Sequence, residues 1–287
     1  AYPQAGGFKF DWPEYPAYHF DSLFFDFNPH AARFAAPIGL DFEALRRGTQ
    51  ELIDAIASGR IRETRIDASS LQGFRDSLCG AFPVVRDLLA VRAAIVEDYA
   101  AFLREAVDEA SGGTKKLFLQ CFPPPLNIAT GFDLAGAGAQ ADKVGVKLYT
   151  MHWPMIEADM LAALTDRAGL APQAVVRAFS RILALAPDTP RTPEDIRYPE
   201  PHEPHPCASA DLTAKMRAAR AELPTGTGLC GITHGYGPLD DVLRRFRAVA
   251  EGTEGAVHVN RYCYLSDEKL AAIGALSAET QVQPAPA

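Results

Sequence analysis

Continuous apolar runs of strand length alternate along this chain with longer segments of helical periodicity, and this alternation limits the possible folds more than any other feature. Strands that are apolar on both faces are typical of a parallel sheet covered by helices. The sequence therefore predicts an α/β fold. We expect strands within residues 6–10, 116–122, 143–151, 229–233 and 256–262.

Between these strands, apolar residues recur at helical spacing. The longest such segment is 84–110, whose apolar residues form one wide face. Residues 187–208 are rich in proline and charge, which predicts an irregular insertion, and the proline- and alanine-rich end 279–287 predicts a disordered tail after a single domain over 1–278. The other expected helices are 41–59, 156–168, 172–186, 210–223, 239–250 and 266–276.

The length of 287 residues suits one large domain, because a (β/α)8 barrel typically needs about 250 residues. The net charge of −8 argues against nucleic acid or an anionic membrane as the main partner. No apolar run approaches the ~20 residues that span a bilayer. The five cysteines are scattered, without the spacing of a disulfide framework or a zinc finger. No strand is followed by a dinucleotide or P-loop fingerprint, so we expect no cofactor.

The polar residues at and after the carboxyl ends of the expected strands form a selective set. The first strand ends in Asp11, Trp12 and Glu14, and active sites of parallel barrels lie at these carboxyl ends. Aromatic rings stack on sugars, while carboxylates, amides and imidazoles bond the hydroxyl groups, so the set predicts a carbohydrate site. The later strands contribute Lys147, Tyr149, His152, Trp153, His234, Tyr236, Asn260, Arg261 and Tyr262.

Each of these residues also has a structural interpretation. Asp11 and Glu14 are either solvated loop charges or catalytic carboxylates, and Lys9 lies on the same side of the strand as Asp11, where it can keep that carboxylate ionised. His152 and His234 are either ordinary hydrogen-bonded histidines or site residues. We expect His202 and His205 to be exposed, and Arg244, Arg245 and Arg247 to form a solvated helix face.

The run Phe8-Lys9-Phe10-Asp11-Trp12 is similar to the Lys-x-Asp nucleophile motif on strand four of clan D glycosidases. The chain as a whole resembles glycoside hydrolase-type (β/α)8 barrels found among uncharacterised bacterial proteins. This resemblance implies that the sequence covers barrel strands four to eight, without the first strands, and that Asp11 is the nucleophile. The sequence departs from the clan D pattern on strand six, where those enzymes carry their acid/base aspartate: after Tyr149 no carboxylate precedes Glu157. The second catalytic group is therefore Glu14, Asp26, Glu157 or a residue upstream of Ala1.

Three functions follow from these observations. The first is a glycosidase-like hydrolase of an oligo- or polysaccharide, with Asp11 as nucleophile or stabiliser and Glu14 as acid/base. The second is a metal-dependent hydrolase or deacetylase, with His152, His234, His258 and Asp11 as ligands. The third is a carbohydrate-binding barrel without catalysis.

Overall fold

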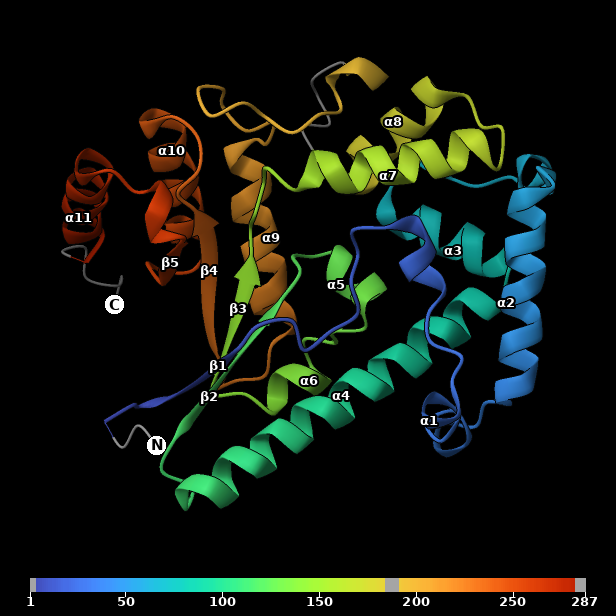
Figure 1. The fold of residues 1–287 in the computed structure, drawn as a ribbon, viewed down its shortest axis with the longest axis horizontal. Helices are drawn as coiled ribbons and strands as arrows, with labels where there is room; N and C mark the ends of the chain where they lie inside the picture. Colours follow the sequence, from blue (N-terminus) through green and yellow to red (C-terminus); the bar gives the residue numbers. More distant parts are fainter. Residues whose placement is uncertain (1–3, 184–190, 282–287) are drawn as a thin grey trace.

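The computed structural model describes residues 4–183 and 191–281, and it contains one sheet of five strands in the order of the sequence. Every neighbouring pair is parallel, and the sheet curls into a half-barrel (Figure 1). The predicted α/β fold is confirmed, and it is consistent with an incomplete (β/α) barrel. The strands are β1 (Gly7–Phe10), β2 (Lys116–Cys121), β3 (Lys143–Lys147), β4 (Gly228–His234) and β5 (Val257–Asn260).

The outer face of the half-barrel forms the main core. Leu119 of β2, Val144 of β3 and Leu229 of β4 stand in register, and all three side chains are buried. The helices α4 (Val84–Ser111) and α9 (Ser209–Glu222) supply the facing apolar side chains. Alternation along the strands sends the intervening residues to the inner face.

The inner face is narrow at Gly145 of β3. A Cβ atom at this position would lie 2.6 Å from the Phe118 ring and 2.7 Å from Cδ1 of Ile232. Because these two side chains close over the glycine, they fill the interior at this level. The next inward residue on β3 is Lys147, at the carboxyl end of the strand. The polar site residues at the carboxyl ends of the strands therefore lie next to the apolar layer that Phe118 and Ile232 form over Gly145.

The remaining helices flank the sheet and extend beyond its carboxyl ends (Figure 1). The helix α10 (Leu239–Gly252) joins β4 to β5, and α7 (Trp153–Asp166) follows β3. None of the helices in the described part combines the length and the hydropathy that crossing a bilayer requires. The others are α1 (Pro29–Ala32), α2 (Phe42–Ala57), α3 (Leu71–Ala81), α5 (Leu126–Thr130), α6 (Gly136–Ala139), α8 (Pro172–Ile182) and α11 (Asp267–Gln281).

Several predicted boundaries differ from the structure. The third strand ends at Lys147 rather than near Met151, and α3 lies in a region without a predicted helix. In the predicted insertion, residues 191–208 contain one short 3-10 helix, Pro193–Asp195. The start of that insertion and the end of the helix expected over 172–186 lie outside the described residues. The last helix continues to Gln281, beyond the predicted domain end, and the rest of the expected tail also lies outside the described residues.

Candidate functional site

Three charged side chains meet where β1 and β3 end. The Nζ atom of Lys147 lies 3.2 Å from Oε1 of Glu14 and 3.6 Å from Oδ1 of Asp11. The side chain of Lys147 is 5% exposed and that of Glu14 is 0% exposed, whereas 62% of the Asp11 side chain is exposed. Asp11 therefore faces solvent, and Lys147 lies between it and the buried Glu14.

Buried donors hold the carboxyl group of Glu14. The backbone N–H of Phe122 donates to Oε1 at 2.8 Å, and the hydroxyl of Thr130 donates to Oε2 at 2.6 Å. Burial raises the pKa of Glu14 to about 7, although Lys147 and these donors act in the opposite direction. Glu14 can therefore exchange a proton near neutral pH, but both of its oxygens already have partners.

Asp11 is also positioned from the inner face of the sheet. The side-chain amide of Gln120 is oriented with its nitrogen toward Asp11 and its oxygen toward Lys9. The nitrogen donates to Oδ1 of Asp11 at 3.0 Å, and the oxygen accepts from Nζ of Lys9 at 2.8 Å. The next residue, Trp12, has a φ of 64°, which is uncommon for a residue other than glycine. This turn places the Trp12 ring 4.8 Å from Nζ of Lys147 and leaves 43% of the residue exposed. Backbone strain of this kind clusters at functional sites.

Aromatic side chains form a continuous arc around the strand ends, which we call the aromatic belt. Neighbouring rings in the belt contact one another, with centroids 5.2–6.5 Å apart. Its rings come from the segments at and after the carboxyl ends of β1, β3, β4 and β5 and from the loop before α9. The sequence did not indicate the contributions of Tyr18, in the loop after β1, and Tyr198, in the loop before α9. The belt consists of Trp12, Tyr18, Tyr149, His152, Tyr198, His234, Tyr236 and Tyr264.

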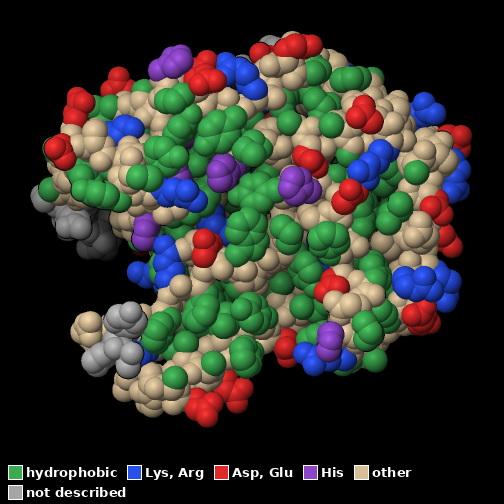
Figure 2. All heavy atoms as spheres, viewed as in Figure 1, with side chains coloured by type: hydrophobic (Ala, Val, Ile, Leu, Met, Phe, Trp, Pro, Cys, Tyr) green, Lys and Arg blue, Asp and Glu red, His purple; other side chains and the backbone are tan. Residues whose placement is uncertain are grey.

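Part of the belt closes on itself. The contacts run from His152 through Tyr149, His234, Tyr236 and Tyr198 and return to His152. Histidine side chains lie among hydrophobic ones on the face shown in Figure 2, with basic and acidic side chains beside them. The surface beside this group is hollowed. The rings meet at interplanar angles of 40° to 85°, so the group combines ring faces, ring edges and polar atoms, a mixture that suits sugar ligands.

The two belt histidines are neutral, and each has a hydrogen-bond partner at Nδ1. Nδ1 of His234 accepts from the backbone N–H of Tyr236 at 3.1 Å, and Nδ1 of His152 lies 2.9 Å from the hydroxyl of Tyr18. Burial lowers the pKa of both imidazoles, that of His234 to about 3. Burial also raises the pKa of Tyr18, so its hydroxyl keeps its proton, and the His152 tautomer decides which of the two groups donates. The neutral His234 therefore carries its hydrogen on Nε2, but the residue is only 3% exposed, whereas His152 is half-buried and closer to solvent.

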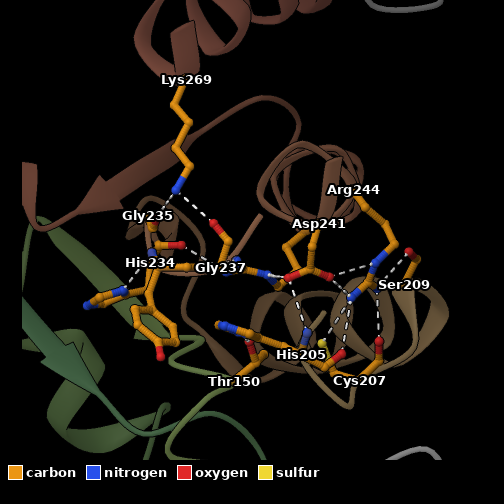
Figure 3. A network of polar contacts seen from close by, with 12 residues as sticks. Thr150, His205, Cys207, Ser209, His234, Gly235, Gly237, Asp241, Arg244 and Lys269 are labelled. Atoms are coloured by element: carbon orange, nitrogen blue, oxygen red, sulfur yellow. Dashed lines mark hydrogen bonds and ion pairs between the residues drawn. The ribbon is translucent and has the colours of Figure 1, made fainter. Parts of the chain in front are cut away.

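A polar network fixes the loop after β4 (Figure 3). The guanidinium group of Arg245 donates to the carbonyl oxygens of His234 and Tyr236 and to Oδ2 of Asp241. From α11, Lys269 donates to the carbonyl oxygens of Gly235 at 2.9 Å and Gly237 at 2.7 Å. His234 points away from Asp241 in this view. The loop is thus held from behind while His234 remains directed toward the belt.

This network corrects two predictions from the sequence. Arg245 is 1% exposed, so Arg244, Arg245 and Arg247 do not form one solvated face. His205 is 3% exposed, contrary to the expected exposure, and its Nδ1 lies 2.7 Å from the hydroxyl of Thr150. His202 is exposed as predicted. Arg245 binds the loop after β4, and His205 joins Thr150, in the loop after β3, to the ring of Tyr236, contacts that the residue pattern alone does not reveal.

The structure brings together most of the predicted site residues, but not all of them. The amide of Asn260 donates to the hydroxyl of Tyr149 at 2.7 Å, which joins β5 to the belt. Trp153 is only 4% exposed and packs in the main core under Lys215, so it lies apart from the exposed aromatic surface. Arg261 and Tyr262 follow β5, where both are exposed.

The other candidate carboxylates lie elsewhere. Glu157 is buried and pairs with Arg191 at 2.7 Å. Asp26 follows the 3-10 helix Phe20–Phe24 and accepts from Asn28. His258 is exposed on β5, one inward position below Asn260. In residues 4–183 and 191–281, no group of three or more histidine, cysteine, aspartate or glutamate side chains could hold a metal ion. The ligand set of the metal-dependent alternative is therefore not assembled in the described part.

Comparisons with known proteins identify no relative. No protein-family model matches the chain, and neither the curated proteins nor the solved structures contain a significant match. The functional argument therefore depends on the site itself.

Proposed function

We propose that this protein is a glycosidase-like hydrolase that binds an oligo- or polysaccharide across the aromatic belt. The observation that carries the proposal is the position of Asp11. Its exposed carboxylate follows a barrel-type strand, lies 3.6 Å from the ammonium group of Lys147 and adjoins the exposed ring of Trp12. Glycoside hydrolysis uses two carboxyl groups beside the sugar ring, and Asp11 supplies the ionised one in this proposal.

Asp11 is the nucleophile or electrostatic stabiliser in this proposal. Glycosidases develop positive charge at the anomeric carbon, and a negative carboxylate below the sugar ring either attacks that carbon or stabilises the charge. Lys147 and Gln120 hold the Asp11 carboxylate from the protein side, which leaves its exposed side for substrate. The half-buried imidazole of His152 is the belt histidine that a sugar hydroxyl reaches in this proposal, while the buried His234 supports the rings around it.

Glu14 supports the reaction in one of two ways. Its pKa of about 7 suits a group that donates a proton at neutral pH, which is the acid/base role. Its bonds to Phe122 and Thr130 instead suit a positioning residue that fixes Lys147 beside Asp11. The first role requires at least one Glu14 oxygen to turn from its present partner toward the substrate.

The test compares Asp11→Asn and Glu14→Gln on two kinds of substrate. We expect Asp11→Asn to reduce hydrolysis of a responsive glycan by about 100-fold or more. If Glu14 is the acid, Glu14→Gln spares aryl glycosides with a dinitrophenolate leaving group, because this group departs without a proton. If Glu14 positions Lys147, both substrates lose activity together.

A second candidate function is a carbohydrate-binding barrel without catalysis. The burial of Glu14 and the pairing of Glu157 favour it, because they leave Asp11 as the exposed carboxylate of this set. Glycan binding that Trp12→Ala weakens, with no hydrolysis by the wild-type protein, would establish this function. Hydrolysis that survives in Asp11→Asn would contradict the proposed nucleophile.

A further inference from the structure

A positive charge stands on the β5 side of the belt, at Arg261. This residue follows β5 and has a φ of 62°, so the chain turns sharply where a regular strand would continue. The carbonyl oxygen of Arg261 accepts from the N–H of Tyr264 at 3.1 Å, and the Tyr264 ring lies 5.2 Å from that of His234. The turn at Arg261 is therefore built into the belt.

The guanidinium group of Arg261 acts on the belt residues themselves. Its charge contributes to lowering the pKa of His152 and His234 and counteracts the rise in the pKa of Tyr149 and Tyr198. These four side chains come from the ends of β3 and β4 and from the loop before α9. The guanidinium group is exposed, and in the part of the chain that the structure describes it forms no ion pair with a carboxylate.

Asp11 and Arg261 give the site opposite charges at its two ends. Asp11 follows β1 and Arg261 follows β5, on the first and last strands of the sheet. Tyr149 of the belt responds to both, since Asp11 raises its pKa and Arg261 lowers it. A ligand across the belt therefore meets a carboxylate at one end and a guanidinium group at the other.

We propose that Arg261 binds a carboxylate of the glycan, so that the substrate class is acidic polysaccharide built from uronic acids. The proposal rests on the proposed function and deepens it. The planar guanidinium group matches a carboxylate through two parallel hydrogen bonds, which an uncharged sugar cannot form. The negative charge then lies at the Arg261 end, while the reacting carbon lies over Asp11.

The test uses matched pairs of polymers, such as polygalacturonate and alginate with their carboxyl-reduced forms, which keep the linkages and lose the charge. Binding is measured by affinity electrophoresis and calorimetry. We expect wild-type protein to bind at least one acidic polymer about ten-fold or more tightly than its reduced form. Because the protein carries a net charge of −8, general attraction of a polyanion does not explain such a preference.

Arg261→Gln should abolish the preference and retain the weak binding of the reduced polymer, while Arg261→Lys should keep part of it. Arg247→Gln, on the exposed side of α10, is the matched control and should behave as wild type. Equal binding of both polymers by wild type overturns the acidic substrate, and an unchanged preference in Arg261→Gln overturns Arg261 as the group that binds its carboxylate. If Trp12→Ala still weakens binding of neutral glycans, the proposed function survives that result. Binding to no glycan at all overturns both.

Discussion

The Nζ atom of Lys147 lies 3.2 Å from Oε1 of Glu14, and both side chains are withdrawn from solvent. The rings of Trp12 and Phe122 cover the ammonium group, at 4.8 and 4.7 Å from Nζ. Removal of one member of a buried ion pair leaves an uncompensated charge, which is more costly than the pair itself is favourable. The pair therefore links the stability of the fold to the site.

We predict that Lys147→Met lowers the free energy of unfolding at about pH 8 by about 1–3 kcal/mol, because the buried Glu14, whose pKa is about 7, then lacks its cation and must take up a proton instead. Lys143→Met is the matched control, since Lys143 is exposed on the same strand and the cost there should stay within about 0.5 kcal/mol. Urea unfolding followed by circular dichroism measures both. Similar losses in the two variants would show that the pair does not stabilise the fold.

The protonation of Glu14 predicts a pH dependence of stability. Its pKa of about 7 in the folded protein exceeds the value of 4.5 for an unperturbed glutamate. Between these values the folded protein binds more protons than the unfolded chain, so the free energy of unfolding decreases as the pH rises. The stabilisation is fully present below pH 4.5 and is lost through pH 7, with a total of up to about 3 kcal/mol.

The difference between wild type and Glu14→Gln isolates this contribution, because the other titrating groups are shared. Urea unfolding at intervals from pH 4.5 to about 8 should give a wild-type stability that declines relative to the variant. A constant difference across this range would mean that Glu14 titrates alike in the folded and unfolded chain.

The sheet was predictable because its evidence is local. Short runs rich in apolar residues mark all five strands, whose last residues include Lys147, His234 and Asn260, while Asp11 and Tyr149 follow within two residues. Since parallel strands share one carboxyl end, their position at one edge follows from the pattern alone. The fold class and the location of the candidate site therefore required no knowledge of tertiary contacts.

The loops could not be predicted in this way. Tyr18 contacts His152 across 134 residues, and Tyr198 joins the belt from a proline-rich segment whose composition indicates only irregular structure. The burial of charged side chains could not be predicted either. The residue pattern of α10 does not distinguish Arg245, which is buried and binds loop carbonyl oxygens, from the exposed Arg247. The helix α3 was missed because none of its residues is buried, so its pattern is weak.

The packing over Gly145 gives a prediction about the base of the site. Gly145→Ala would place a methyl group against the Phe118 ring and Ile232 and should destabilise the fold by about 1–3 kcal/mol. Gly80→Ala in α3 is the control, since no atom lies within 4 Å of the added carbon and alanine favours a helix. We expect Gly80→Ala to be neutral or stabilising by up to about 1 kcal/mol. Thermal unfolding compares the two, and equal effects would refute the close packing.

The last prediction concerns Lys269, which restrains the loop that carries His234 and Tyr236. Its ammonium group donates to the carbonyl oxygens of Gly235, Gly237 and Tyr264. Lys269→Met removes these bonds at the rim of the belt, so we expect a stability loss of only about 1 kcal/mol. We expect a larger effect on the loop, with faster amide exchange at 235–237 and about five- to ten-fold weaker glycan binding, because Tyr236 and Tyr264 lose their fixed positions.

The exposed pair Arg217–Glu251 provides the control for Lys269. Both of its side chains are more than half exposed, so Arg217→Met should change neither loop exchange nor binding. Hydrogen exchange by mass spectrometry distinguishes the variants, since the bonds of Lys269 restrain a segment near the ligand and those of Arg217 do not. If Lys269→Met leaves exchange at 235–237 unchanged, Arg245 alone suffices to hold the loop, because it binds the carbonyl oxygens of His234 and Tyr236 from the buried side.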